Sequence, residues 1–443
     1  MKKLLFMFSF FFLFVLNGKT QEVEILTLED CLRIGIDNNL SLEGKRKEIQ
    51  RSKYGVSENR SKLLPQINAI AGYSNNFDPP VSVTDGSSYG VPYNITQTLQ
   101  HSANAGLEMQ MPLFNQTLYT SMSIAKVMEE ISRLSYGKAR EDVILQISKM
   151  YYLGQVTAEQ IMLIKANITR LEELRDITQA FFDNGMSMEV DLKRVNINLE
   201  NLKVQYDNAQ AMMKQQLNML KYIMDYPAEK EIALTPVNTD SITTVALTGL
   251  SENIYELQLS QSQVQLAERQ KKIITNGYIP SLSLTGSWRY AAYTDKGYHW
   301  FHSGPSNQWF RSYGVGLTLR IPIFDGLDKT YKIKKAMIDI ENKRLAWEDA
   351  RKNLQTQYLN AVNDLMNNQR NFKKQKDNYL LAEDVYAVTS DRYREGIASM
   401  TEVLQDEMQM SEAQNNYISA HYNYRVTNLM LLKLTGQIES LVK

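Results

Sequence analysis

The sequence predicts a mainly α-helical chain that gives four antiparallel strands to a membrane β-barrel and long coiled-coil helices to an α-barrel. Three observations lead to this fold class. The chain contains an internal repeat, short segments of each repeat alternate between apolar and polar residues, and longer segments space their apolar residues by three and four. Gly (21) and Pro (10) are scarce among 443 residues, which favours long uninterrupted elements.

Residues 1–21 are predicted to be a secretory signal peptide. Lys2 and Lys3 precede an apolar run over residues 4–16, and a short polar stretch follows. The alternative is an uncleaved anchor, but the run is shorter than the ~20 residues that a membrane-spanning helix needs. Cys31 is the single cysteine, so the chain has no intrachain disulfide, and no cysteine stands at the cleavage point to carry a lipid.

The rest of the chain is predicted to be a duplicated domain. A first repeat covers residues 22–225 and a second covers residues 251–443, and Gly185 in the first corresponds to Gly396 in the second at an offset of 211 residues. Two long copies differ from a solenoid, which stacks at least three short units. Residues 226–250 are expected to form a linker at the equator of the helical part.

Each repeat contains two segments with the two-residue period of a β-strand. Tyr313, Val315 and Leu317, for example, alternate with Gly and Thr. The four predicted strands cover residues 67–73, 103–111, 282–290 and 311–321. Their lengths approach the ~9–11 residues of a tilted membrane-spanning strand with one face toward lipid. The alternative is a soluble sheet half covered by helices.

External loops are predicted between the paired strands, at residues 75–102 and 294–310. The second loop is rich in aromatic residues, which indicates an aromatic belt at a membrane surface. His299 and His302 in this loop form an HxxH pair, but no further ligand stands nearby in the sequence, so no metal site is predicted.

The helical segments carry heptad seams and are unusually long. Residues 117–181 and 327–394 are each predicted to run as one helix of about 100 Å, at about 1.5 Å per residue. Each is expected to return through two shorter helices stacked end to end. The summed lengths of two short helices should match that of a long helix. This predicts that residues 189–225 stack on 252–278, and that residues 400–435 stack on 28–62.

Turn residues fit this path of the chain. Gly185 and Gly396 are predicted at the tips of the helical hairpins, where a C-cap needs a positive φ. Asn115 and Asp325 are predicted to cap the two long helices. Four prolines are predicted at junctions between strands and helices: Pro65, Pro112, Pro280 and Pro322.

Composition excludes several classes of function. Lys plus Arg (49) equals Asp plus Glu (49), so the chain lacks the positive field of a nucleic-acid binder. No Gly-rich phosphate loop and no nucleophile elbow appears, so no enzyme and no cofactor is predicted.

Four strands cannot close a barrel, because open edges would leave backbone groups unpaired in hydrocarbon at several kcal/mol each. The chain is therefore expected to associate with copies of itself. Two copies would give eight strands and three would give twelve, and the strand count alone leaves both open.

Short motifs at matching places in the two repeats carry a family resemblance. They are the strand starts Leu64-Pro65-Gln66-Ile67 and Ile279-Pro280-Ser281-Leu282, the strand exits Met111-Pro112-Leu113-Phe114 and Ile321-Pro322-Ile323-Phe324, and the hairpin tips at Asn184-Gly185 and Glu395-Gly396. With the opening segment Leu26-Thr27-Leu28-Glu29-Asp30-Cys31, they resemble the TolC outer-membrane factor family over nearly the whole mature chain.

This resemblance implies a homotrimer in the outer membrane of a Gram-negative bacterium, in contact with outer-membrane lipid. The trimer would share a twelve-stranded barrel and extend into the periplasm as a twelve-helix α-barrel. It also implies two partners, a periplasmic adaptor (membrane fusion) protein and an inner-membrane pump of RND or ABC type. The function implied is a passive exit duct for drugs, toxic compounds or polypeptides of type I secretion.

The resemblance also points to a periplasmic constriction at the hairpin tips. The family often places acidic residues at the positions of Glu402 and Gln405, and only Glu402 fits. An Arg of some relatives is replaced by Ala398, so the family's closing network does not transfer as a whole. Asp191 matches an acidic tip position in the first repeat, and Asp406 is a charge within a predicted apolar seam.

Glu402 and Asp406 are predicted to form an acidic ring that favours cations and holds the entrance closed at rest. The alternative is that both carboxylates only solvate a helix face or pair with a nearby Lys. For the chain as a whole, the competing hypothesis is a structural or adhesive coiled-coil protein of the cell envelope. That hypothesis explains the heptads but not the amphipathic strands.

Overall fold

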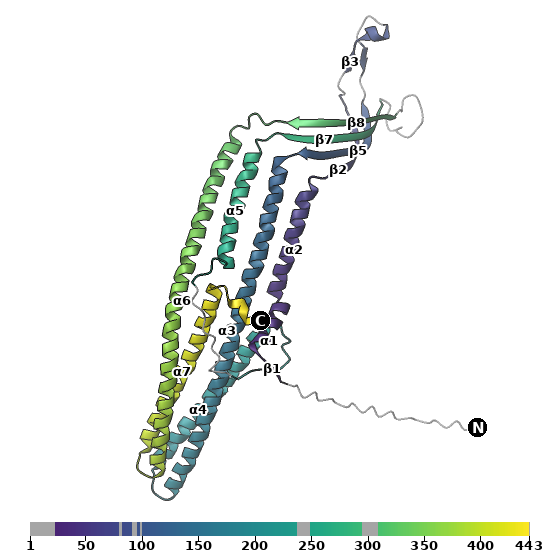
Figure 1. Ribbon diagram of the computed structural model, residues 1–443. Helices are drawn as coiled ribbons and strands as arrows, with labels where there is room; N and C mark the ends of the chain where they lie inside the picture. Colours follow the sequence, from purple (N-terminus) through teal and green to yellow (C-terminus); the bar gives the residue numbers. More distant parts are fainter. Residues whose placement is uncertain are drawn as a thin grey trace, which may run out of the picture. The chain divides into compact units, whose positions relative to one another are not determined.

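The computed structural model describes residues 23–78, 82–90, 95–97, 100–236, 249–294 and 309–442. The predicted signal peptide, residues 237–248 of the predicted linker and His299 and His302 lie outside these ranges. The chain divides into two compact units (Figure 1). One unit comprises residues 44–138 and 255–353, and is called here the sheet unit. The other comprises residues 1–43, 139–254 and 354–443, and is called the helical unit.

The sheet unit is built on a four-stranded antiparallel sheet. Its strands are β2 (Gln66–Asn75), β5 (His101–Phe114), β7 (Ser281–Thr294) and β8 (Trp309–Arg320), in the order β2-β5-β7-β8. The contact between β5 and β7 joins the two repeats into one sheet, and β2 and β8 are the edge strands. The strands β3 (Ser82–Thr84) and β4 (Ile95–Gln97) form a short hairpin. The 3-10 helix η1 (Gly86–Tyr89) lies between them in the sequence.

The strand register places all four apolar stripes on one face of the sheet. Ala69 lies opposite Leu107, Leu107 opposite Trp288, and Trp288 opposite Tyr313. On the other face Glu108 stands opposite Ser287 and binds Arg289 at 2.5 Å. Because side chains of a strand alternate, this sheet has one apolar and one polar face, and Trp288 and Tyr313 on the apolar face are exposed.

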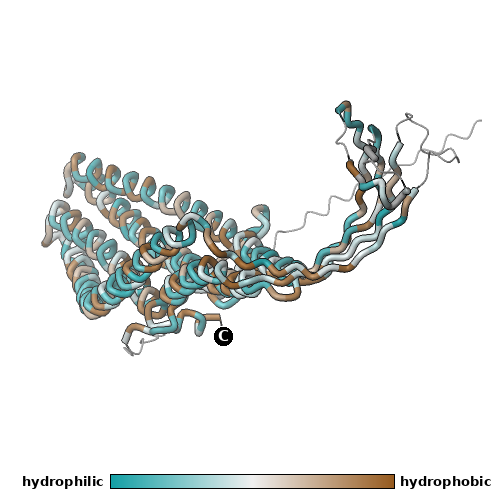
Figure 2. Tube along the Cα trace, turned by 90° about the horizontal axis from the view of Figure 1, so that it is seen from above, coloured by the Kyte–Doolittle hydropathy of each residue, from teal (hydrophilic) through white to brown (hydrophobic). Residues whose placement is uncertain are grey.

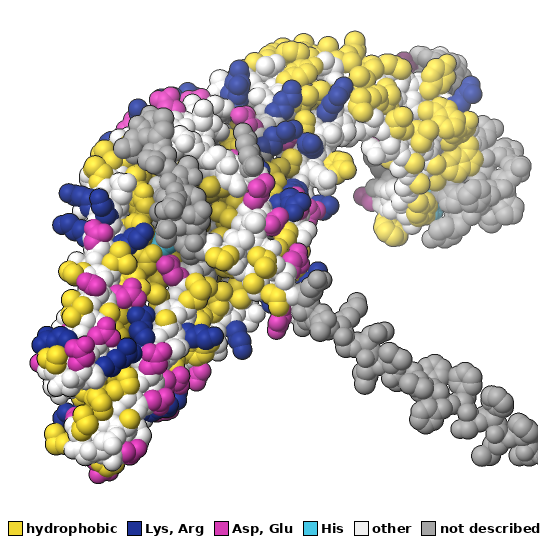
Figure 3. Space-filling model, turned by 60° about the horizontal axis from the view of Figure 1, so that its bottom comes forward, with side chains coloured by type: hydrophobic (Ala, Val, Ile, Leu, Met, Phe, Trp, Pro, Cys, Tyr) yellow, Lys and Arg dark blue, Asp and Glu magenta, His cyan; other side chains and the backbone are white. Residues whose placement is uncertain are grey.

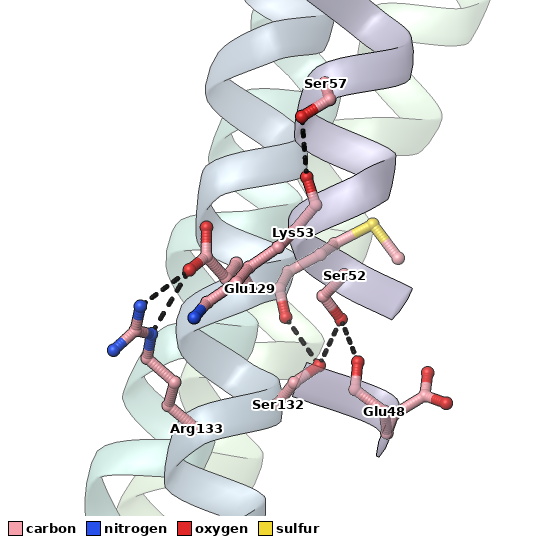
Figure 4. A network of polar contacts seen from close by, with 8 residues as sticks. Glu48, Ser52, Lys53, Ser57, Glu129, Ser132 and Arg133 are labelled. Carbon is pink, nitrogen blue, oxygen red and sulfur yellow. Dashed lines mark hydrogen bonds and ion pairs between the residues drawn. The ribbon is translucent and has the colours of Figure 1, made fainter. Parts of the chain in front are cut away.

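Helical segments of the sheet unit lead to and from these strands. They are α2 (Leu40–Ser61), the first part of α3 (Gln116–Asp183), α5 (Tyr255–Asn276) and the first part of α6 (Asp328–Arg394). α2 packs closely on α3 because two small side chains meet there: Ser52 Oγ and Ser132 Oγ are 2.6 Å apart (Figure 4). α5 is joined to α6 by Arg344 and Glu268 at 2.8 Å.

The helical unit contains the rest of α3 and α6 and three further helices. They are α1 (Leu28–Asn38), α4 (Glu189–Met224) and α7 (Met400–Leu434), followed by the 3-10 helix η2 (Ile438–Val442). An apolar cluster of this unit draws on α3, α4, α6 and α7, with Leu171, Leu199, Tyr386 and Val403 fully or nearly fully buried. Figure 2 shows apolar and polar positions alternating along the helical parts of the chain. With helical periodicity, this alternation gives a helix one apolar side that can pack against its neighbours.

The segment at the predicted linker adds one strand to this unit. β6 (Ile232–Leu234) pairs in parallel with β1 (Glu24–Leu26), which brings the start of the chain beside residues that follow α4. Tyr151 donates from its hydroxyl to the Leu26 carbonyl at 3.3 Å, so α3 also holds this two-stranded sheet. Burial raises the pKa of the neighbouring Cys31 thiol to about 12, and this cysteine is free.

The predicted stacking of the short helices was wrong. The Asn39 amide donates to the Ile223 carbonyl at 2.7 Å, so α4 ends against α1 and the start of α2. The Ser251 N–H donates to the Leu434 carbonyl, so α7 ends against the segment that precedes α5. The prediction assigned the opposite partners because it used lengths alone. α4 and α7 have 36 and 35 residues, and α2 and α5 have 22 each, so either pairing satisfies the lengths.

The structure also differs from the prediction at a helix break, at an N-cap and at one junction proline. The first predicted helix is broken at Asn39, whose side-chain oxygen accepts from the Leu42 N–H at 3.1 Å and starts a new helix. Asp325 is not the N-cap of α6, which begins at Asp328, although its carboxylate accepts from the Lys329 N–H at 3.2 Å. Pro112 lies within β5, where the register shifts between Pro112 and Phe114. Across the described residues, no helix combines the length and apolar character that a membrane-spanning helix needs.

Candidate functional site

The two helical hairpins end in turns of the same construction. Gly185 and Gly396 have φ values of 73° and 75°, a region that side chains beyond glycine rarely occupy. In the first turn Met186 N–H donates to the Phe181 carbonyl at 2.8 Å, and in the second Ile397 N–H donates to the Arg392 carbonyl at 2.8 Å. These backbone hydrogen bonds, each between residues five positions apart, close the ends of α3 and α6 as Schellman motifs.

The helices that follow the two turns begin differently. Ser399 caps α7: its hydroxyl accepts from the Glu402 N–H at 3.3 Å, and the Glu402 carboxylate accepts from the Ser399 N–H at 3.0 Å. This capping box uses one oxygen of Glu402 for the backbone. Met188 is the N-cap of α4 and makes no side-chain cap bond, which leaves Asp191 available to another partner.

Asp191 and Glu402 occupy the same position in the two repeats, and one arginine links their surroundings. Arg194 binds Asp191 at 3.2 Å and donates to the Thr401 hydroxyl at 3.3 Å. The first turns of α4 and α7 are therefore tied together close to both carboxylates. A carboxylate at a helix N-terminus is stabilised by the helix dipole, so both acids suit these positions.

The other two predicted residues lie farther along α7. Gln405 is exposed, and Asp406 is half-buried beside a hollow of about 200 Å³ against α6. Leu381 and Val385 of α6 line this hollow and are themselves 63% and 42% exposed. The structure thus places Asp406 at the rim of the helix packing and not in the apolar seam that the heptad count predicted.

The charge in the buried seam is Glu407, which sequence reasoning missed. Glu407 is 5% exposed, and burial raises the pKa of its carboxyl, while Arg170 opposes that shift. Arg170 from α3 binds Glu383 of α6 at 3.0 Å. The signal that could have found Glu407 is a second heptad reading that runs through Val403, Glu407, Met410 and Gln414.

Further polar contacts cross the helical unit above the tips. Asn167 and Gln414 are both buried. Their side-chain amides form two hydrogen bonds with each other, at 2.7 and 3.4 Å. Tyr417 donates to Glu159 at 3.0 Å, and the ring of the fully buried His421 stands 3.4 Å from the second Glu159 oxygen. Arg425 donates to His421 at 3.2 Å. The Asn167–Gln414 and Tyr417–Glu159 hydrogen bonds hold α3 and α7 in one register, while the Arg425–His421 contact lies within α7.

The junction prolines flank the strands at unequal distances. Pro65 and Pro280 directly precede β2 and β7, and Pro322 follows β8 by two residues. A proline at a strand end costs no ladder bond, because its missing N–H lies outside the pairing. Within the ranges that the structure covers, no three His, Cys, Asp or Glu side chains gather as a metal site requires.

Comparison with known proteins identifies the family. The model of the outer membrane efflux protein family matches residues 34–224 and 246–437. The outer membrane protein TolC of Vibrio cholerae is 21% identical over 399 residues, which cover 86% of this chain and 84% of that protein. The toluene efflux pump outer membrane protein TtgC of Pseudomonas putida is 23% identical over 431 residues, covering 92% of this chain and 82% of that protein.

Solved structures share the fold. The outer membrane protein VceC from Vibrio cholerae has a TM-score of 0.73 at 14% identity, covering 92% of this chain and 96% of that one. The open state of the Neisseria gonorrhoeae MtrE outer membrane channel has a TM-score of 0.74 at 17% identity, with coverages of 92% and 88%. Because the matched segments include most of both repeats, the chain belongs to the outer membrane efflux protein family and is an efflux channel protein of the outer membrane.

Proposed function

We propose that three copies of this chain form a passive exit duct, with a shared twelve-stranded barrel in the outer membrane and a twelve-helix α-barrel in the periplasm. The observation that carries the proposal is the sheet of β2, β5, β7 and β8, which has one apolar face and two edge strands. An open sheet with an exposed apolar face is stable in a bilayer only when its edges pair with further strands. Family membership supports three copies rather than two.

The duct would act with a periplasmic adaptor protein and an inner-membrane pump of RND or ABC type. The hairpin tips at Gly185 and Gly396 are the natural contact for an adaptor, since they are the far ends of α3 and α6. Residues 1–21 would direct export and be removed, and residues 226–250 would form the equatorial region. Drugs, toxic compounds or secreted polypeptides would pass through without chemical change, because the duct itself has no catalytic role.

Purification from outer membranes tests the assembly. We expect a species three times the mass of the chain that survives detergent, becomes monomeric on boiling, and opens single channels in planar bilayers. A structural or adhesive coiled-coil protein of the envelope would give no conductance. A dimer, or a trimer that never conducts, would contradict the proposal.

The same proposal places a constriction at the first turns of α4 and α7. Asp191 and Glu402, repeated in three copies, would give a ring of carboxylates that attracts cations, with Asp406 behind it. Support comes from the capping box, which holds Glu402 in place, and from the Arg194 link between the two turns. Gln405 is exposed but adds no charge to this ring.

The constriction can be tested without disturbing the helix ends. Gln at position 402 preserves a capping box, so Glu402→Gln removes charge but keeps the cap. We expect Asp191→Asn with Glu402→Gln to lower cation selectivity, and Asp406→Asn to lower it further. Glu200→Gln on the exposed side of α4 is the matched control. Selectivity equal to that of the unmodified channel in all variants would refute the acidic ring.

A further inference from the structure

We infer that the junction between strands and helices binds the headgroups of anionic phospholipids. This inference rests on the proposed function, because it requires the sheet to lie in a membrane. It concerns the four connections of the sheet unit and the helical residues next to them. The ranges are 54–65, 115–123, 269–280 and 321–335, and they are called here the junction zone.

Each of the four ranges of the junction zone exposes a large apolar side chain. Leu64, Tyr119, Ile279 and Ile323 are 58%, 41%, 40% and 93% exposed. These positions lie beyond the ends of the strands. Tyr278 and Tyr331 stand among them with Lys329 and Lys334 over their rings at 5.1 and 5.5 Å. Tyrosine beside lysine is typical of a membrane surface, where the ring lies at headgroup level.

Charge in the junction zone is strongly one-sided. The zone contains nine Lys and Arg residues but only Glu58, Asp325 and Asp328 as acids. Each of the three acids is already paired with a lysine, at 3.4, 2.9 and 2.7 Å. Among the residues that the structure describes, six cations of the zone have no carboxylate pair: Arg60, Arg269, Lys271, Lys272, Lys334 and Lys335. The whole chain is neutral, so this local excess is not a general property of its surface.

The long side chains of these cations carry their charges toward a headgroup layer. Lys272 stands four residues inside the end of α5, and Lys334 stands six residues inside α6, which is about 6 and 9 Å along the helix axis. The headgroup layer extends about 5–7 Å beyond the hydrocarbon on each side. Lysine stems lie along apolar surface and carry the ammonium group outward, so these side chains reach lipid phosphates. Figure 3 shows dark blue side chains beside yellow ones where helices give way to strands.

A groove between α5 and α6 offers a place for one lipid. Its volume is about 770 Å³, and Lys271, Lys272, Met337 and Ile340 are among the residues that line it. Thr275 and Asn276, at the groove's end nearest the sheet, are the last residues before the connection to β7. Glu268 in this groove pairs with Arg344 at 2.8 Å, and Glu341 is a second acid of its lining. A phosphate would meet the lysines while the glycerol and upper acyl chain cover Met337 and Ile340.

The test uses two sets of substitutions in the full chain. In the junction set, Lys271, Lys272, Lys334 and Lys335 are all changed to Gln. In the control set, the four lysines Lys165, Lys214, Lys373 and Lys374 of the helical unit, which are equally exposed or more so, are changed to Gln. Both sets remove the same charge from long helices. Each protein is reconstituted into vesicles of equimolar phosphatidylcholine and phosphatidylglycerol, extracted, and examined by native mass spectrometry for retained lipid.

We expect the unmodified protein and the control set to retain phosphatidylglycerol over phosphatidylcholine by about tenfold, a ratio that corresponds to about 1.4 kcal/mol. The junction set should retain the two lipids within about twofold. Inorganic phosphate, added to phosphatidylcholine vesicles, should not protect the trimer against heat as phosphatidylglycerol does. Equal loss in both sets, or protection by phosphate alone, would overturn the inference.

Mass and conductance are recorded on the same samples. A conducting trimer without lipid preference overturns this inference and leaves the proposed duct intact. Absence of a conducting trimer for the unmodified protein overturns both.

Discussion

Asn167 and Gln414 are buried polar side chains of the helical unit that depend on each other. Asn167 and Gln414 satisfy each other's amides away from water, so removal of one partner leaves the other unpaired. We expect Gln414→Leu to destabilise the protein by about 1–3 kcal/mol, because an unpaired buried amide bears its full desolvation cost. Loss of helical circular dichroism in denaturant measures this change.

The double substitution is the control for this pair. Asn167→Leu together with Gln414→Leu removes both amides, so it should cost less than the single changes added together. Strict additivity of the two single effects would show that the amides do not interact.

Glu141 makes stability depend on pH. Burial raises the pKa of this carboxyl to about 7, Lys433 opposes the shift, and Glu439 and Asp142 add to it. The folded protein therefore holds a proton that the unfolded chain has lost, and stability falls as pH rises from about 4.5 to about 7. The loss is at most about 3 to 4 kcal/mol, at 1.36 kcal/mol per pKa unit. Melting temperatures between pH 4.5 and 8 measure it.

Glu141→Gln is the matched variant, because it keeps the shape of the side chain without the titration. Its melting temperature should decline less across the same pH range than that of the unmodified protein. Parallel pH profiles would show that Glu141 is ionised without cost.

Which single residue of a helix faces the buried seam was the hardest feature to predict from the sequence. Asp406 and Glu407 are neighbours, and the heptad count from Val403 accepts either as the next seam position. Only the packing of α7 against Arg170 and Tyr386 decides that Glu407 is inside. Similarly, Ser399 and Met188 stand at equivalent positions of the two repeats, yet only Ser399 forms a capping box.

Elements were predicted more closely than their partners. α3, α4, α6 and α7 begin and end within two residues of the expected bounds, because heptad spacing extends over many turns and breakers are few. The stacking of α4 and α7 failed, since it depends on contacts such as Asn39 with Ile223 that no length records. A helix period reports which face is buried, but not which helix covers it.

The hairpin turns test the element scale. Gly185 and Gly396 have positive φ and open space around the Cβ position, so Ala there meets backbone strain and no clash. We expect Gly185→Ala or Gly396→Ala to cost about 1–2 kcal/mol, and Asn at either position to cost less. Thermal unfolding of purified protein measures the difference.

Gly55 supplies a control in which the change from Gly to Ala should raise stability and not lower it. It lies inside α2, also with open space around its Cβ position, so Gly55→Ala should stabilise the protein by about 0.5–1 kcal/mol. If all three alanine variants stabilise alike, the positive φ at the tips imposes no strain.

At the scale of the whole molecule, the sheet explains why one chain is insufficient. Period-two alternation predicted the four strands, and the observed register aligns their apolar residues on one face. The order β2-β5-β7-β8 leaves β2 and β8 as edges. In the proposed trimer, β8 of one copy would pair with β2 of the next, which the sequence alone does not reveal.

Disulfide cross-linking tests this closure. Asn68 on the polar face of β2 is changed to Cys and combined, one at a time, with Cys at the β8 positions Ser312, Gly314, Gly316 and Thr318. One combination should link neighbouring copies on oxidation, because paired strands bring Cβ atoms to about 4.5–5.5 Å. Cys31 is buried and should not interfere.

Denaturing gels after oxidation should show one, two and three linked chains and nothing larger, since a closed ring of three has no free edge. Single-cysteine variants should remain monomeric on the same gels, and reducing agent should return all species to one chain. A ladder that continues beyond three, or no link in any combination, would contradict pairing of β8 with β2 in a trimer. A ladder ending at two would instead indicate an eight-stranded barrel, the closure that strand count had left open.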